Sequence, residues 1–391
     1  MSVLAPPPVQ PPPEHGEPEA LIEEARRRAR KRRLAYTVIA IAAVAVGVAL
    51  FGLLKNSGGN NATAFANGFS SGGKTLPLSA NGKLALVDST GSLLSSVNPD
   101  GSAPRLLARC RDFTACRIRA FAWSPDGERL LFFRSDGEDI SSYSLYVVDA
   151  DGRNIKELAS CGFCGLLYGS RATWSPDGSS IAFTGDNGLV VADVVRGVTR
   201  SLTHCGRPCA DLFPAWSPDG SKIVFARTGG LYTVKPDGSD LTKLTSDHLA
   251  SNPTWSPDGR KLAFDGGNQI YVVDADGSQR ASLLTGSRGS GPFVPSWSPD
   301  GKRILFFYTP GTPGAFSAEV WTMNPDGTSR SRLYHSGCCV DNWSPPIWSP
   351  NGKSIAFSAD SAGGVLVMKS DGTQLHTASS NPSDVAWQPI R

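Results

Sequence analysis

The sequence has no excess of charge over most of its length. Of its 38 Lys and Arg and 35 Asp and Glu residues, eight basic and five acidic ones fall in residues 1–55, which leaves 30 of each for residues 56–391. This larger part also lacks a long basic run, whereas nucleic-acid-binding proteins cluster Lys and Arg to meet the phosphates. We therefore expect no nucleic-acid partner.

Recognisable catalytic and metal-binding patterns are also lacking. The five histidines show no ligand spacing, so we expect no metal site and no cofactor. They are His15, His204, His248, His335 and His376. No set of nucleophile, base and acid appears in a recognised motif. Most Asp residues fall in turns, where the side chain bonds its own backbone, so no catalytic residue is assigned.

What the sequence does have is a repeat with a period near 42 residues. A Trp-Ser-Pro-Asp-Gly segment followed by an apolar run recurs, with Asn351 in place of Asp in the last copy. Pro presets the backbone of a tight turn and Gly supplies positive φ, so each copy predicts strand, turn and strand. The tryptophans of this pattern are Trp123, Trp174, Trp216, Trp255, Trp297, Trp348 and Trp387.

Two further strands complete each unit. After Trp255, for example, residues 269–273 predict a third strand, residues 274–277 a second turn and residues 281–285 a fourth strand. Four antiparallel strands in about 40 residues make one propeller blade. One blade cannot cover both of its faces, so neighbouring blades must stack on it. We expect each Trp to anchor this stacking rather than to form a site.

Seven units start in the sequence, a degenerate one at Leu78 and one at each of the first six tryptophans. The strand that ends at Trp387 is predicted to be the innermost strand of the first blade, because closing the ring in this way leaves no free inner edge. The sequence therefore predicts an all-β, seven-bladed propeller over residues 75–391, with six or eight blades as alternatives.

The repeats resemble those of TolB-type (WD40-like) β-propeller proteins. The resemblance rests on Trp-Ser-Pro-Asp-Gly followed by runs such as Ile181-Ala182-Phe183, and on Tyr-Val-Val-Asp-Ala-Asp-Gly at 271–277, and it covers about residues 75–391. It implies the propeller fold. TolB itself would add an α/β domain before the propeller and a soluble periplasmic state, and this sequence departs from TolB in both respects.

Ahead of the propeller, the sequence predicts a membrane anchor. Residues 1–33, rich in Pro and then in Arg, are expected to be disordered and cytoplasmic. Residues 34–54 hold no charge and are long enough for a transmembrane signal-anchor helix. Positive charge before them, and only Lys55 just after them, places the propeller on the extracytoplasmic side. A cleaved signal peptide is the alternative, and the Gly/Ser/Asn-rich residues 55–74 predict a flexible linker.

All eight cysteines lie in the predicted propeller, in four close pairs that each precede a repeat Trp. The pairs are Cys110 and Cys116, Cys161 and Cys164, Cys205 and Cys209, and Cys338 and Cys339. Outside the cytoplasm such pairs are candidate disulfides, placed in loops that gather on one rim. A redox pair at Cys161 and Cys164 and a zinc site are alternatives. The adjacent Cys338 and Cys339 could instead bond between loops.

These features favour a non-enzymatic function. We expect a membrane-anchored binding or scaffold module at the cell envelope, whose partner is a protein, a peptide or a glycan. Long insertions on the disulfide-bearing rim supply the candidate binding residues Phe316, Tyr334 and Trp343. The alternative is an enzyme, a lyase or hydrolase of surface polymers that uses the central funnel.

Overall fold

The computed structural model describes residues 82–110, 116–135, 143–161, 171–205, 211–287, 290–311, 318–335, 345–359, 364–380 and 382–389. All of these belong to one compact unit, Lys74–Arg391. The predictions for residues 1–81, including the membrane span 34–54, lie outside the described residues. Among the residues that are described, none forms a helix of the length and apolarity that a membrane crossing requires.

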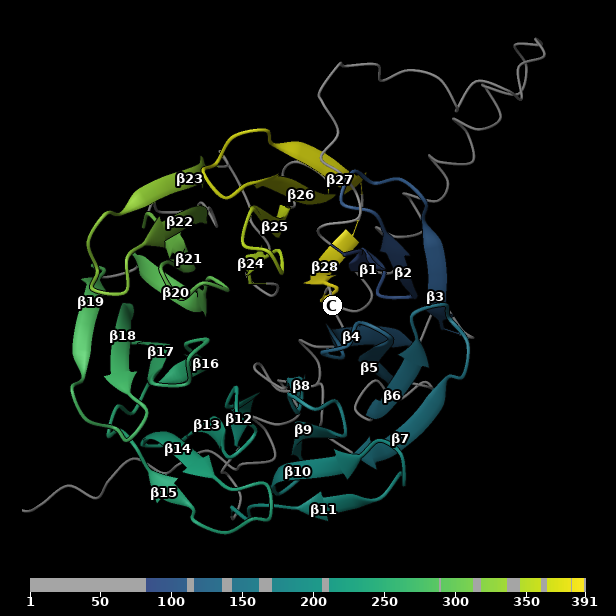
Figure 1. Cartoon of the computed structure of the whole chain (residues 1–391), viewed down its shortest axis with the longest axis horizontal. Coiled ribbons are helices and arrows are strands. Elements are labelled where there is room, and N and C mark those ends of the chain that lie inside the picture. Colours follow the sequence, from purple (N-terminus) through teal and green to yellow (C-terminus); the bar gives the residue numbers. More distant parts are fainter. Residues whose placement is uncertain are drawn as a thin grey trace, which may run out of the picture. The chain divides into compact units, whose positions relative to one another are not determined.

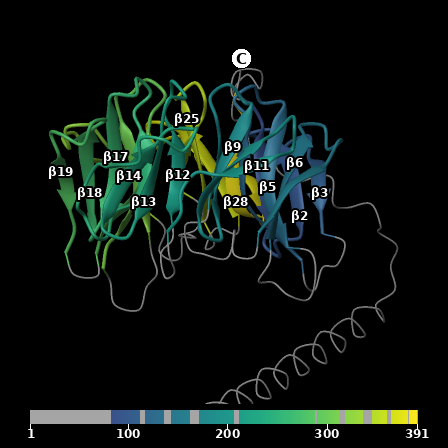
Figure 2. The same ribbon diagram turned by 90° about the horizontal axis from the view of Figure 1, so that it is seen from below.

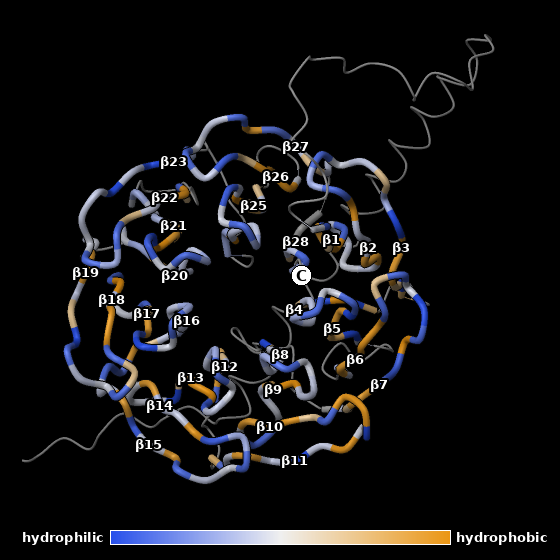
Figure 3. Tube along the Cα trace, in the orientation of Figure 1, coloured by the Kyte–Doolittle hydropathy of each residue, from blue (hydrophilic) through white to orange (hydrophobic). Residues whose placement is uncertain are grey.

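Seven four-stranded antiparallel sheets stand around a central axis (Figure 1). They confirm the predicted all-β, seven-bladed propeller, and the alternatives of six and eight blades were wrong. In six of the blades the strands follow one another from the centre to the rim, as alternating apolar and turn segments dictate. Figure 3 shows that apolar residues gather on the strands, whereas the connections are mostly hydrophilic.

The strands are numbered along the chain. Blade 1 contains β1 (Leu84–Asp88), β2 (Leu93–Val97), β3 (Arg105–Arg109) and β28 (Pro382–Trp387). Blade 2 contains β4 (Arg117–Trp123), β5 (Arg129–Ser135), β6 (Tyr143–Asp149) and β7 (Lys156–Cys161). Blade 3 contains β8 (Ala172–Trp174), β9 (Ser180–Gly185), β10 (Gly188–Asp193) and β11 (Thr199–Ser201). Blade 4 contains β12 (Leu212–Trp216), β13 (Ile223–Arg227), β14 (Gly230–Val234) and β15 (Thr242–Lys243).

The remaining three blades repeat this order. Blade 5 contains β16 (Ser251–Trp255), β17 (Lys261–Gly266), β18 (Gln269–Asp274) and β19 (Ala281–Thr285). Blade 6 contains β20 (Gly291–Trp297), β21 (Ile304–Thr309), β22 (Glu319–Met323) and β23 (Ser331–His335). Blade 7 contains β24 (Ile347–Trp348), β25 (Ser354–Ala359), β26 (Gly364–Lys369) and β27 (His376–Ser380).

The ring closes through its last strand, as predicted. β28 pairs antiparallel with β1, with Leu84 opposite Trp387, and so becomes the innermost strand of blade 1. Gln388 extends the closure, because its Oε1 accepts the Lys83 N–H at 3.0 Å and its Nε2 donates to the Gly127 carbonyl at 2.7 Å. The last residues therefore tie blade 1 to the first turn of blade 2.

The Ser-Pro-Asp-Gly turns are held by their own side chains. In blade 5, Ser256 Oγ donates to Asp258 Oδ1 at 2.6 Å and accepts the Lys261 N–H at 2.9 Å, while the Arg260 N–H donates to Asp258 Oδ1 at 3.1 Å. Gly259 has a φ of 70°, which only glycine adopts at little cost. The Ser–Asp contact recurs in blades 2, 3, 4 and 6, and Asn351 replaces the carboxylate in blade 7.

The repeated tryptophans pack between neighbouring blades. Trp255 of blade 5 lies in a buried cluster with Phe264 and with Ala215 of blade 4, and its Nε1 donates to the Ala215 carbonyl at 3.1 Å. The residue before each Trp is small in most blades, so it leaves room for the indole ring of the next blade. Trp174 and Trp348 donate in the same way to the preceding blade, at 3.0 and 3.4 Å.

Because the strands are antiparallel, the disc has two distinct faces, seen edge-on in Figure 2. We call one the turn face: it carries the tight turns between first and second strands and between third and fourth strands. We call the other the loop face: it carries the connections between second and third strands and the passages from one blade to the next. Blade 2 shows both, because β4 runs from the loop face at Arg117 to the turn face at Trp123.

Candidate functional site

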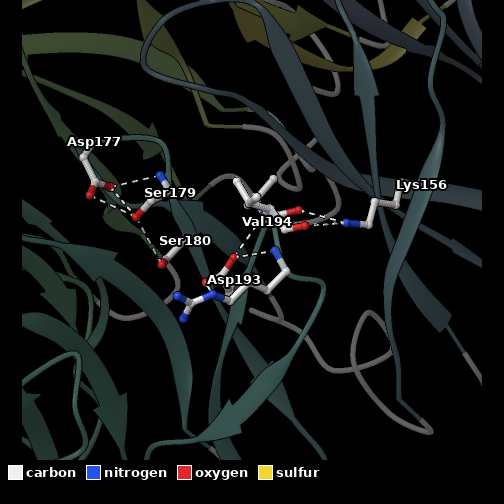
Figure 4. Close-up of polar contacts among 8 residues, drawn as sticks. Lys156, Asp177, Ser179, Ser180, Asp193 and Val194 are labelled. Carbon is white, nitrogen blue, oxygen red and sulfur yellow. Dashed lines mark hydrogen bonds and ion pairs between the residues drawn. The ribbon is translucent and has the colours of Figure 1, made fainter.

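On the turn face, polar groups are occupied by the fold itself. Figure 4 shows this in blade 3, where Asp177 bonds Ser179, and where the Asp193 carboxylate accepts the N–H groups of Val195 and Arg196 at 3.0 and 2.8 Å. Hydrogen bonds from the Ser175 hydroxyl and the Ser179 N–H hold the pKa of Asp177 below its usual value. A turn built in this way has a structural role, and it recurs almost unchanged around the ring.

The loop face carries a disulfide. Cys110 and Cys116 are bonded, with Cα atoms 5.6 Å apart, and they confirm that predicted pair. The bond links the end of β3, the outermost strand of blade 1, to the start of β4, the innermost strand of blade 2. Backbone bonds fix both ends of the connection, because the Cys110 N–H donates to Ser92 and the Ile118 N–H to Gly91. The two ends of this passage between blades are therefore held together.

The other cysteines are described only in part. Cys205 is buried, and its N–H donates to the Asn187 carbonyl at 2.9 Å. Cys161 ends β7, which places it on the loop face as predicted. Cys164, Cys209, Cys338 and Cys339 lie outside the described residues. Their pairing stays a prediction.

A buried ion pair stands where blade 3 passes to blade 4. Arg227 Nε and Nη2 donate to Asp211 Oδ1 and Oδ2 at 2.6 and 2.7 Å, in the two-pronged geometry that suits a guanidinium. Thr203 Oγ1 also donates to this carboxylate, and Thr184 Oγ1 donates to the Asp211 carbonyl at 2.8 Å. Asp211 is fully buried, and its four hydrogen bonds come from three residues. Thr184 and Thr203 hold the start of β12 against blade 3, and Arg227 holds it within blade 4.

A second buried carboxylate, Asp265, lies at the loop-face end of β17 between blades 5 and 6. Its Oδ1 accepts bonds from Asn252 Nδ2 at 3.0 Å and Ser251 Oγ at 3.2 Å, and the carboxylate also takes the Val294 N–H. Burial raises the pKa of Asp265 to about 6, and the hydrogen bonds offset only part of this. Val294 belongs to a bulge with φ 52°, a costly conformation for a β-branched residue, so Asp265 holds a strained segment.

A third carboxylate organises blade 6. Glu319, at the start of β22, is buried and accepts hydrogen bonds from Trp321 Nε1 at 2.7 Å and Arg332 Nη1 at 3.0 Å. The His335 ring meets the same carboxylate through Nδ1 at 2.9 Å. About half of the Arg332 and His335 side chains is exposed, 52% and 51%. Glu319 thus holds the guanidinium of Arg332 and the imidazole of His335 at the solvent-exposed surface. These residues lie next to two long connections, the one before β22 and the one after β23.

Of the predicted binding residues, only Tyr334 is described. It follows Arg332 and Leu333 on β23, and its ring centre lies 4.8 Å from that of Phe357 in blade 7. Partial burial raises the pKa of the Tyr334 hydroxyl. Tyr334 therefore packs between two blades at the base of the insertion. Phe316 and Trp343 lie outside the described residues.

Sequence reasoning did not find Asp211, Arg227, Asp265 or Glu319. A signal existed for one of them, because Asp265 ends a run, Leu262-Ala263-Phe264, that otherwise predicts a buried strand. The sequence carried no comparable signal for the others, since Asp211 directly precedes β12 and Glu319 begins β22, each after a connection whose length varies between blades. Their role depends on partners from other strands or another blade, which spacing alone cannot reveal.

Across the described ranges, no group of three or more His, Cys, Asp or Glu side chains could hold a metal ion. A shallow cleft of about 240 Å³ lies between blades 7 and 1, where Asp88, Arg105 and Ser379 contribute to its lining. It lies toward the outer strands β3 and β27, away from the innermost strand β28.

This architecture defines a class: closed seven-bladed β-propellers with a Ser-Pro-Asp-Gly repeat. A family model described as the TolB beta propeller domain matches residues 187–391, and the chain belongs to that family. No curated protein matches the sequence significantly.

Solved structures with the same fold come from proteins of different activities. TolB from Acinetobacter baumannii is 19% identical, with a TM-score of 0.52 over 79% of this chain and 67% of that one. An oligogalacturonate lyase in complex with manganese is 15% identical, with a TM-score of 0.55 over 77% and 86%. A periplasmic gluconolactonase from Pseudomonas aeruginosa is 12% identical, with a TM-score of 0.56 over 80% and 100%. At these identities the likeness shows the fold alone.

Proposed function

We propose that this protein is a membrane-anchored, extracytoplasmic propeller that binds a protein, peptide or glycan partner through its loop face. The observation that carries the proposal is the contrast between the two faces. The turn face repeats one short, self-bonded turn, whereas the loop face differs from blade to blade and carries the disulfide and the three buried carboxylates. Variable connections on a rigid scaffold are where binding residues are usually found.

Two features of the loop face support binding. The Cys110–Cys116 disulfide fits an oxidising compartment, in which such bonds persist. It also joins the two ends of the passage into β4, and groups that are already held in place lose less conformational entropy when a partner binds. The buried pair of Asp211 and Arg227 likewise holds the residue that precedes β12.

An enzyme is the second candidate, and one observation favours it. The exposed imidazole of His335 contacts the buried carboxylate of Glu319, a pairing that general bases use. However, both residues lie on β22 and β23, the third and outermost strands of blade 6. They therefore do not face the central funnel, where the propeller enzyme of our alternative would work.

The test is a crosslinking pull-down of the full chain in its own cells. A loop-face variant, Arg119→Ala with His248→Ala, is compared with a turn-face variant, Arg260→Ala with Lys302→Ala; all four side chains are exposed. We expect a specific partner that is lost with the loop-face variant and kept with the turn-face variant. Loss with the turn-face variant alone would contradict the proposal. Degradation of a surface polysaccharide that stops in His335→Ala, with no partner recovered, would favour the enzyme.

A further inference from the structure

The turn face carries exposed aliphatic side chains, and those of blades 2, 3 and 4 follow one another around the disc. Leu375 of blade 7 stands at the place of Ile155 and Leu241 and is also 45% exposed, so it is blade 3, with two exposed valines, that departs most from the repeat. Val195 and Val198 of blade 3 are 79% and 57% exposed, and Ile155 of blade 2 and Leu241 of blade 4 are 45% and 47% exposed. All four lie in or just after the turn between a third and a fourth strand. We call these residues the apolar rim. Exposed aliphatic side chains that gather in this way usually mark a contact surface.

Val195 lies in a turn that departs from the repeat, because this turn is one residue longer. The Gly197 N–H donates to the Asp193 carbonyl four residues back, whereas the Gly152 N–H of blade 2 donates to the Asp149 carbonyl three residues back. The other six blades have Asp at the equivalent position, and its carboxylate accepts the N–H two residues on. These residues are Asp100, Asp151, Asp237, Asp276, Asp326 and Asp371, with N–H to carboxylate distances of 2.8 to 2.9 Å. Valine cannot make this bond. Blade 3 therefore gives up a stabilising contact and exposes a large apolar side chain in its place.

The blade 3 turn is held by other groups, so Val195 is not needed for its shape. Asp193 caps the Val195 and Arg196 N–H groups, and Lys156 Nζ of blade 2 donates to the carbonyls of Val194 and Val195, both at 3.1 Å (Figure 4). Arg200 makes the matching link to blade 4, where it donates to the Pro236 and Asp237 carbonyls. These hydrogen bonds join the turns of blades 2, 3 and 4 into one continuous surface.

Charge at the apolar rim is nearly balanced. Arg153 and Arg196 are each 80% exposed, and each lies near an aspartate of its own turn, Asp151 at 3.5 Å and Asp193 at 4.0 Å. The surface therefore offers aliphatic side chains flanked by arginines, without a strong field of either sign. Such a composition suits the boundary between lipid headgroups and acyl chains, where aliphatic groups are buried and arginines stay hydrated.

The chain also enters the propeller on the turn face. The first described residues, Gly82 and Lys83, lie beside Gln388 and the Gly127 turn, which are on the turn face. The chain N-terminal to them carries the proposed anchor, residues 34–54, so only the 27 residues 55–81 separate that anchor from the turn face. Tethering at that range gives the turn face a high effective concentration of lipid.

We propose that the apolar rim rests on the lipid surface of the membrane, so that the loop face points away from the bilayer. The inference rests on the proposed anchoring and deepens it by naming which side of the propeller meets lipid. Ile155, Val195, Val198 and Leu241 enter the interfacial region, and the ion-paired arginines lie among the headgroups. A loop face oriented in this way is open to a partner outside the cell.

The experiment places a photo-crosslinking amino acid at position 195 of the full chain, in vesicles of phosphatidylethanolamine and phosphatidylglycerol. The control position is 326, which has the same place in the blade 6 turn. We expect lipid adducts at 195 and few at 326. Equal adduct yields at the two positions, no adducts at either, or adducts in cells to a protein instead of lipid would each overturn the inference.

A second variant separates this inference from the proposed function. Val195→Asp with Val198→Asp replaces two exposed side chains in a turn that Asp193 and Lys156 hold, so we expect a nearly unchanged Tm and a lipid adduct yield at position 155 that falls about tenfold. The loop-face variant Arg119→Ala with His248→Ala should leave that yield unchanged. If the protein does not float with vesicles at all, the proposed anchoring fails. If it floats but position 195 gives no lipid adduct, only the apolar rim assignment fails.

Discussion

The two faces of the propeller are built from the same strands and do different work. On the turn face, each blade repeats a short segment whose Ser, Asp and Gly satisfy one another, as Ser256, Asp258 and Gly259 do. On the loop face, polar groups from different blades meet, as Asp211 meets Thr184 and Asp265 meets Val294. Local bonds make a turn that can be copied. Bonds between blades allow each junction to differ, which is what a specific binding surface needs.

The largest effect on stability is expected where the tryptophans pack between blades, in the core that lies between the two faces. Trp255→Ala removes an indole ring that packs between blades 4 and 5, and we expect a loss of about 3–5 kcal/mol in the free energy of unfolding. Urea denaturation measures it. Trp255→Phe keeps most of the buried area and should cost less. A loss below about 1 kcal/mol for the alanine variant would show that blade stacking does not depend on these rings.

The loop face should be nearly as sensitive where its charges are buried. Arg227→Met leaves the Asp211 carboxylate buried without its cation, and removing one member of such a pair costs about 3–5 kcal/mol. The double variant Asp211→Asn with Arg227→Met leaves no unpaired charge and should cost less than the single variant. If the two variants unfold at the same urea concentration, the pair does not act as a unit.

Replacing Asp265 should have the opposite effect on stability, because burial of its ionised carboxylate destabilises the folded state. Its folded pKa of about 6 lies above the unfolded value of 3.8, so the native state takes up the proton more readily and stability falls as pH rises from about 3.8 to 6. Asp265→Asn should therefore stabilise the protein above pH 6, by at most about 3 kcal/mol. Thermal unfolding at pH 4 and pH 7.5 checks this. A stabilisation of equal size at both values would contradict the assignment.

The smallest effect is expected in a single turn. Asp258→Ala removes the acceptor for the Ser256 hydroxyl and the Arg260 N–H, a loss of about 1 kcal/mol. These bonds lower the pKa of Asp258, so its contribution is present above the unfolded pKa of 3.8 and is lost as pH falls through the lower folded value. Asp258→Asn is the matched control, because Asn351 makes the same bonds in blade 7. Thermal unfolding or chevron analysis measures the stability of both variants.

The turn face could be predicted from the sequence because its bonds are local. Ser, Pro, Asp and Gly at fixed offsets determine a turn, and the apolar runs around it determine the strands. Even the closing strand could be predicted. The segment before Trp387 has the pattern of an innermost strand, and it pairs with β1 to complete blade 1. The number of blades could be predicted because the same strand and turn pattern occurs in every unit, so each copy supports the assignment of the others.

The loop face could not be predicted in the same way. The sequence placed the Cys110–Cys116 pair correctly, because two nearby cysteines in one connection limit the options. It gave no indication that Arg227 meets Asp211 or that His335 meets Glu319, since those contacts depend on how strands and blades register against one another. Tyr334 was predicted for its place in an insertion, and its contact with Phe357 became clear only from the packing of blades 6 and 7.

One measurement tests the difference between the faces directly. Alanine or aspartate replaces every exposed residue of both faces in turn, and the same cells report the amount of folded protein and the amount of partner captured. We predict that variants with normal amounts of folded protein but lost capture map to the loop face. Turn-face variants should lose capture only in proportion to folded protein, apart from those in the apolar rim. Capture-specific losses concentrated on the Ser-Pro-Asp-Gly turns would contradict the account.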